Sequence, residues 1–222
     1  MASPSLGIRP RPLRQSNAIW DGATKLNAIL NDDAVPDDCR QSLPPIDIPP
    51  YELRMNIRNT KRIAQVFGSL AKDPPRFGGL EGPMVRFVQC RSADAVAAAD
   101  DAVDALLDDW PPGRIALLTT KHRHNLQHEV VGGQGWAAYW DAFFAAEDVF
   151  YGHVLGFKGL ERPVVVLAVD GFKQPERAKE MLYVGLSRAR TQLVVCGDLA
   201  EIAAAGGEGV RKRLQDAEQW TP

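Results

Sequence analysis

Residues 163–169 read PVVVLAV, and residues 192–197 read QLVVCG. Both runs are apolar at successive positions, so strands formed there would be buried on both faces. Such strands are typical of the centre of a parallel sheet that helices cover. The residues between the two runs, 176–189, have the apolar spacing of a helix. A strand, a helix and a second strand in this order favour parallel pairing.

The same alternation extends in both directions along the chain. We predict further strands at 84–90, 114–120 and 148–154. We predict a helix at 61–71 with Asn59 or Thr60 as the cap, and an Ala-rich helix that Ser92 caps. Further helices are predicted around 121–128 and 136–146, starting at Asp198, and at 207–218. The sequence therefore predicts an α/β fold with a mainly parallel sheet covered by helices.

The N-terminal part has a different composition. Residues 1–14 mix Pro, Ser and Arg without periodicity and are interpreted as a tail. Residues 15–30 favour one or two short helices, and the Asp- and Pro-rich residues 31–50 favour a linker. We therefore divide the chain into an N-terminal segment 1–50, an α/β domain 51–205 and a C-terminal helix 206–222.

Composition excludes several functional classes. The 222 residues carry a net charge of −2, so the chain lacks the basic excess of a stand-alone nucleic-acid binder, and any DNA contact is expected to be local. The three cysteines form no CxxC pair, which favours reduced thiols. We see neither a membrane span nor a secretory signal, and expect a cytoplasmic protein.

Three short segments combine glycine with charge: NIRNT (56–60), GFKGLE (156–161) and LYVGLSRAR (182–190). The second is a turn between two predicted strands, and ligand sites form where such turns leave the carboxyl ends of strands. Arg188 and Arg190 fall near the end of a predicted helix, where the dipole favours cations, whereas Arg58 falls at a helix start, where a cation needs an anionic partner. Taken singly, the second segment is better explained as a surface turn and the third as an ordinary helix end, whereas Arg58 at a helix start is less easily explained in this way.

Together the segments resemble motifs IV, V and VI of the UvrD/Rep family of superfamily-1 DNA helicases. NIRNT is similar to the family's NxRS/T element, FKGLERPVVVL to its KGLE-x-x-VVxL element, and LYVGLSRAR to its YVxxTRAR element. The order of the three elements and their strand or helix junctions also agree. The resemblance implies a RecA-like domain of the P-loop NTPase type, namely the second motor domain of a helicase.

The resemblance also implies roles for individual residues. Arg58 and Arg188 would be arginine fingers on the γ-phosphate of ATP, because guanidinium forks suit developing phosphate charge. Glu161 would accept from the ribose hydroxyls, and Asn56 would orient its loop. The remaining residues implied are Ile57, Gly159 and Tyr183 near the nucleotide, and Phe157, Lys158 and His153 near single-stranded DNA.

The sequence departs from the family at several positions. Ile57 stands where an aromatic residue usually stacks on adenine, and Leu155 where a histidine is usual, with His153 two positions earlier. The short segment between the strands at 114–120 and 148–154 leaves no room for the large inserted helical subdomain of UvrD itself. These departures put adenine stacking and histidine-mediated DNA coupling in doubt.

No GxxxxGK[ST] sequence occurs in the chain, so the cradle for ATP phosphates and Mg²⁺ has to come from a separate P-loop domain or chain. The expected partners are that domain and single-stranded DNA, with no membrane. Two alternatives stay open: a non-enzymatic, truncated helicase-like module that binds a protein or DNA, and an unrelated nucleotide-binding enzyme.

A metal site has weak support. His124 and His128 are four residues apart, which would place both on one helix face, but no further ligand of suitable type is near. A solvated polar helix is the preferred interpretation. Five aspartates between positions 100 and 109 give an acidic helix face that would repel DNA.

Overall fold

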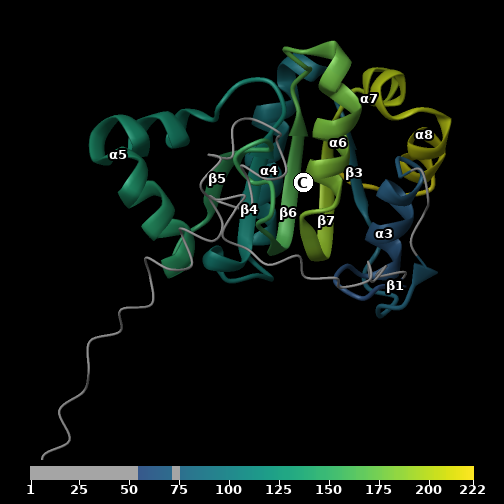
Figure 1. The fold of residues 1–222 in the computed structure, drawn as a ribbon, viewed down its shortest axis with the longest axis horizontal. Helices are drawn as coiled ribbons and strands as arrows, with labels where there is room; N and C mark the ends of the chain where they lie inside the picture. The colour runs from purple at the N-terminus through teal and green to yellow at the C-terminus, as the bar shows by residue number, and fades with distance from the viewer. Residues whose placement is uncertain (1–54, 72–75) are drawn as a thin grey trace, which may run out of the picture. The chain divides into compact units, whose positions relative to one another are not determined.

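The computed structural model describes residues 55–71 and 76–222. The predicted tail, the helices at 15–30 and the linker at 31–50 lie outside the described residues, as do Leu53 and Arg54. In the described part of the chain, one six-stranded sheet has the order β5-β4-β6-β7-β3-β8 (Figure 1). Its strands are β3 (Arg86–Gln89), β4 (Ile115–Thr119), β5 (Phe150–His153), β6 (Arg162–Val169), β7 (Ala189–Gly197) and β8 (Glu218–Gln219). Every pairing in it is parallel.

Helices connect these strands. They are α3 (Lys61–Gly68), α4 (Ala95–Leu106), α5 (Asn125–Ala145), α6 (Ala178–Leu186), α7 (Leu199–Gly206) and α8 (Glu208–Gln215), with short 3₁₀ turns at Ser92–Asp94, Pro112–Arg114 and Pro175–Arg177. The expected α/β fold with a parallel sheet is therefore confirmed. The two apolar runs that decided it, in β6 and β7, lie at the sheet's centre and pair along their length.

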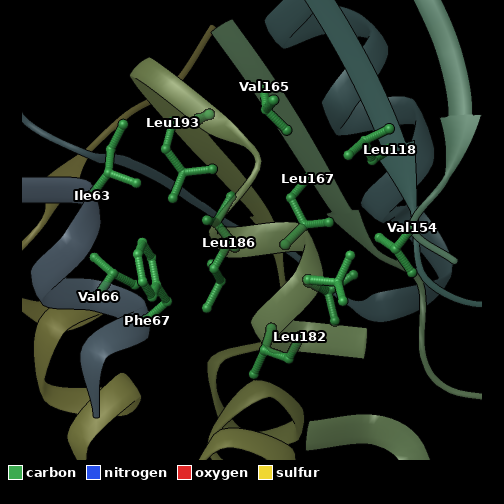
Figure 2. Packing of buried hydrophobic residues seen from close by; sticks show 14 of the residues in the cluster. Ile63, Val66, Phe67, Leu118, Val154, Val165, Leu167, Leu182, Leu186 and Leu193 are labelled. Carbon is green, nitrogen blue, oxygen red and sulfur yellow. The ribbon is translucent and has the colours of Figure 1, made fainter. Parts of the chain in front are cut away.

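Alternate residues of the central strands face two separate cores. Val165 and Leu167 of β6 join the core under α3 and α6, which Figure 2 shows with Phe67 and Leu182. Val164 and Val166 join the opposite core, which α4 covers with its alanines. The period-2 side-chain alternation of a strand produces this division, and it explains why neither face of β6 is polar.

Some local expectations were wrong. Ser92 does not cap α4, because its hydroxyl lies 2.7 Å from the Glu201 carboxylate and a 3₁₀ turn precedes the helix. The helix expected to reach residue 189 ends at Leu186, because β7 already begins at Ala189. Asp198, in contrast, caps α7 as expected and accepts from two backbone N–H groups.

Three two-residue strands, β1, β2 and β8, add to this framework. β1 (Met55–Asn56) and β2 (Arg76–Phe77) form a small parallel pair beside α3, and β8 adds an edge strand next to β3. The long helix α5 contains a break at Gly135, whose φ is 82°. None of the described helices combines the length and apolar character that a membrane span requires.

Candidate functional site

The three charged segments meet at the amino ends of β6 and β7. The backbone N–H of Arg162 donates to the carbonyl of Arg188 (3.2 Å), and that of Thr60 donates to the carbonyl of Arg190 (3.0 Å). In the sheet register, Arg162 lies opposite Ala189. The loop before α3, the turn before β6 and the end of α6 are therefore held together at one edge of the sheet.

Two asparagines order the loop before α3. Asn56 Oδ1 accepts from the backbone N–H groups of Arg58 (3.0 Å) and Asn59 (3.2 Å), and Asn56 Nδ2 donates to Asn59 Oδ1 (3.0 Å). Asn59 is 2% exposed, and its Nδ2 donates to the carbonyls of Ser187 (3.0 Å) and Ala189 (2.6 Å). The Asn59 side chain thus joins this loop to the segment between α6 and β7.

The Arg188 side chain lies inside the protein. It is 9% exposed, and its guanidinium donates to Ser187 Oγ (2.8 Å from Nη2) and to the carbonyls of Val184 (3.2 Å) and Leu160 (3.4 Å). Burial first, and then the charge of Arg58, lower the pKa of Arg188 to about 10. Arg188 is therefore still protonated at neutral pH, a buried cation with neutral hydrogen-bond acceptors.

Arg58 is the more exposed of the two arginines, with 41% of its side chain accessible. Its Nη2 donates to the Ser187 carbonyl (2.8 Å), and its Nε lies 3.6 Å from Glu161 Oε2. The other Glu161 oxygen lies 3.5 Å from Nε of Arg190. Two guanidinium groups therefore flank one carboxylate, with the buried cation of Arg188 nearby, and this cationic excess favours an additional anion.

Ile57, Tyr183 and Gly159 differ in how they contribute. Ile57 is 74% exposed and stands next to Arg58. Tyr183 lies edge-to-face on Phe67 of α3, with ring centroids 5.6 Å apart. Gly159 has a φ of +89°, a conformation that side-chain-bearing residues rarely adopt. Only Ile57 presents an open apolar surface of the kind that a nucleotide base or a partner domain could cover.

The expectation that the turn after β5 builds a site at the carboxyl ends of the strands was wrong for Glu161. His153 lies opposite Thr119 at the carboxyl end of β4, whereas Glu161 directly precedes Arg162, the first residue of β6. A connection between parallel strands has to return along the sheet, so its two ends lie at opposite edges. Glu161 and the arginines therefore lie at the amino ends of the strands, whereas His153 lies at the carboxyl ends.

The three residues expected near DNA have different surroundings. Phe157 is fully buried in the core, so the structure does not support a DNA contact for its ring. His153 Nδ1 accepts from the Leu155 N–H (3.3 Å) while its Nε2 lies 3.2 Å from the Thr120 carbonyl, and burial lowers the pKa of His153. Lys158 remains exposed, with its Nζ 3.8 Å from Glu180. Lys158 alone keeps a charge available to phosphate.

Residues 152–196 match the UvrD-like helicase C-terminal domain family. This segment resembles that domain. It contains the second and third motifs, with β6, α6 and β7, and the match confirms the resemblance to UvrD/Rep helicases inferred from the sequence. The match supports a helicase-related role.

Among solved structures, the chain is similar to the C-terminal domain of a possible DNA helicase from Lactobacillus plantarum WCFS1. The identity is 15%, the TM-score is 0.44, and the similarity covers 70% of this chain and 96% of that one. A search of curated proteins found no match.

Sequence reasoning missed the roles of Asn59 and Ser187 in this site. Asn59 was considered only as a helix cap, but its amide bonds the segment that follows α6. Ser187 accepts from Arg58 through its carbonyl and from Arg188 through its hydroxyl. A second asparagine directly before a helix start was the available signal, because short polar side chains at such positions usually bond backbone groups.

Proposed function

We propose that this chain is the second motor half of an ATP-dependent DNA helicase or translocase. It supplies Arg58 and Arg188 to an ATP site that a separate P-loop domain completes. The observation that carries the proposal is the convergence of both guanidinium groups on Ser187 at one edge of the sheet. The UvrD-like match over residues 152–196 supports the same assignment.

The two arginines suit different parts of this task. Arg58 is accessible, and its ion pair with Glu161 at 3.6 Å is long and partly exposed, so a phosphate competes well for it. Arg188 is desolvated and, among the residues that the structure describes, is bonded only to neutral oxygens; a charged acceptor forms stronger hydrogen bonds than a neutral one. A phosphate that replaces these acceptors would therefore form stronger hydrogen bonds with both guanidinium groups.

Glu161 has two functions in this proposal. Its carboxylate lies between Arg58 and Arg190 and holds the exposed finger near the edge of the sheet. When a phosphate takes Arg58, Glu161 is released to accept hydrogen bonds from the ribose hydroxyls. The P-loop domain would hold the ATP phosphates and Mg²⁺, for which this chain carries no GxxxxGK[ST] sequence.

Steady-state ATP hydrolysis tests the proposal. The chain alone should not hydrolyse ATP, and a separately produced P-loop domain of a UvrD-type helicase should restore turnover. Arg58→Ala and Arg188→Ala should each lower that turnover by roughly 10³-fold or more, because an arginine finger stabilises charge that develops in the transition state. Arg91→Ala is the matched control, since that side chain is 83% exposed and, within the described part of the chain, pairs only with Asp94 of the neighbouring 3₁₀ turn.

Retained turnover in both finger variants would overturn the proposal. Arg188→Ala also removes a buried side chain, so its folding has to be compared by circular dichroism. Arg58→Lys provides a second check that is independent of folding. It keeps the charge at an exposed position but loses the bidentate fork, and turnover should still fall.

A non-enzymatic interaction module is the second candidate. The exposed Ile57, in place of a stacking aromatic residue, and the neutral hydrogen bonds of Arg188 favour it. This candidate predicts a stable complex with a protein or DNA partner whose affinity does not change when ATP is added. The motor assignment predicts that ATP strengthens the complex with the P-loop domain.

A further inference from the structure

The Arg188 guanidinium occupies an inward position at the end of its own helix. Its Nε donates to the Val184 carbonyl (3.2 Å), its Nη1 to the Leu160 carbonyl (3.4 Å), and both Nε (3.3 Å) and Nη2 (2.8 Å) to Ser187 Oγ. Val184 belongs to the last turn of α6, where the helix dipole is negative and favours a cation. The end of α6 therefore offers this charged group a favourable place inside the protein.

The Ser187 hydroxyl is the centre of this arrangement. Ser187 is 1% exposed, and its Oγ accepts from Arg188 and also donates to the Val184 carbonyl (3.1 Å). A hydroxyl has one donor and two acceptor positions, so all three are used here. The other acceptors of Arg188 within the described residues are backbone carbonyls. Ser187 is therefore the side chain through which a substitution can change the position of Arg188.

Outside the inward position, the Arg188 cation meets other positive charges. The Glu161 carboxylate already lies 3.6 Å from Arg58 Nε and 3.5 Å from Arg190 Nε. The charge of Arg58 opposes a positive charge on Arg188, because it is the second cause, after burial, that lowers the pKa of Arg188 to about 10. A phosphate beside Arg58 would reverse the sign of this interaction. Without an anion the inward position is therefore favoured, and with one an outward position is favoured.

We propose that the Ser187 hydroxyl retains Arg188 in the inward position until an anion binds beside Arg58. Ser187 is then a positioning residue: it does not touch the nucleotide, but it sets the fraction of molecules in which Arg188 is available. A group that is available only part of the time weakens binding in proportion to that fraction. The inference rests on the proposed function, because it concerns regulation of the same ATP site, yet its first test needs neither ATP nor a P-loop domain.

The first experiment measures how accessible Arg188 is in the full chain. Phenylglyoxal reacts with exposed guanidinium groups, and mass spectrometry of the digested chain gives the reaction rate at each arginine. Arg188 should react more slowly than Arg58, whose side chain is 41% exposed. Ser187→Ala should raise the rate at Arg188 by roughly 10- to 150-fold, the factor that corresponds to the loss of a hydrogen bond to a charged group. Equal rates at Arg58 and Arg188 in the unchanged chain would overturn the proposal without any variant.

Ser187→Thr is the matched control, because it keeps the hydroxyl and because the family's YVxxTRAR element has threonine at this place. Its rate at Arg188 should equal that of the unchanged chain. Arg91, which is 83% exposed, and the half-buried Arg162 are references within each sample, and Ser187→Ala should leave both of their rates unchanged. An equal rise at Arg162 would show a general loosening of the fold. That result, or a Ser187→Thr variant that reacts like Ser187→Ala, would refute retention by the hydroxyl.

ATP turnover with the P-loop domain gives a second measurement, whose sign separates positioning from a structural role. Ser187→Ala should raise kcat/KM for ATP, because the inward position then competes less with the γ-phosphate for Arg188. A residue that only stabilises the fold would lower kcat/KM when it is replaced. Ser187→Thr should return kcat/KM to the value of the unchanged chain, and an unchanged or lowered kcat/KM in Ser187→Ala would contradict the proposal.

The two proposals fail separately. If the P-loop domain restores no turnover but Ser187→Ala makes Arg188 react faster, retention by Ser187 stands and the motor assignment fails. If turnover depends on Arg188 but Ser187→Ala changes neither the reactivity of Arg188 nor kcat/KM, the motor assignment stands and retention fails.

Discussion

At the scale of single residues, the site formed by Arg58, Arg188 and Glu161, the arginine site, is held together by hydrogen bonds that the charges alone do not predict. Arg58 and Arg188 come from segments 130 positions apart and meet because Ser187 accepts from both. Burial and, after it, the nearby charge of Arg58 lower the pKa of Arg188 to about 10. Protein structure here brings like charges together, which a bound anion would stabilise.

Asn59 is the residue on which this convergence depends. Its buried Nδ2 donates to the carbonyls of Ser187 and Ala189. Asn59→Ala leaves those carbonyls without that donor, and we expect the free energy of unfolding to fall by about 2–3 kcal/mol. Urea denaturation measures the change. Asn125→Ala, at an exposed position, should stay within about 0.5 kcal/mol of the unchanged chain, and an equal effect of the two substitutions would contradict this role.

At the scale of helices and strands, the sequence predicted the five longer strands of the sheet. β6 and β7 were recognised because each is a continuous apolar run, and both occupy the centre of the sheet. β1, β2 and β8 were missed, since each has two residues and so carries no detectable period. Strand content is therefore well encoded where burial covers both faces, and poorly encoded at the edges.

The candidate site was only partly predictable. The sequence brought out the three charged segments, and the structure places all three at one edge of the sheet. The sequence-based expectation overlooked that the connection after His153 has to return along a parallel sheet, which separates His153 from Glu161. The burial of Arg188 and Phe157 was equally hidden, because side-chain exposure in a loop depends on packing between segments far apart in the chain.

The break in α5 at Gly135 leads to a prediction about the stability of this helix. Gly135 has φ 82° and ψ 174°, a region that is essentially restricted to glycine. Gly135→Ala should therefore lower the free energy of unfolding by about 1–3 kcal/mol. Gly133→Ala, at a regular helical position with open space around it, should raise it by about 0.5–1 kcal/mol. Urea denaturation of both variants measures the difference, and equal stabilities would show that the break is dispensable.

At the scale of the whole molecule, the sheet separates two different surfaces. The guanidinium groups of Arg58 and Arg190 flank the Glu161 carboxylate at the amino ends of β6 and β7. A pocket whose lining includes Trp136 and Arg123 lies at the carboxyl ends of β4 and β5. These two surfaces therefore lie at opposite ends of the strands. The helices cover both faces of the sheet, where the two cores lie.

The far edge of this sheet is closed by the last described strand. Glu218 and Trp220 donate backbone N–H groups to the carbonyls of Val85 and Phe87, and the Arg86 guanidinium lies 4.6 Å from the Trp220 ring centroid. Deletion of 217–222 removes these contacts, so the free energy of unfolding should fall by about 2–3 kcal/mol. The exposed edge strand β3 should then promote association between copies of the chain. Urea denaturation and light scattering at several protein concentrations measure the two effects. Deletion of 221–222 alone, both exposed, is the control. If the longer deletion leaves a monomer of unchanged stability, β8 does not protect the edge.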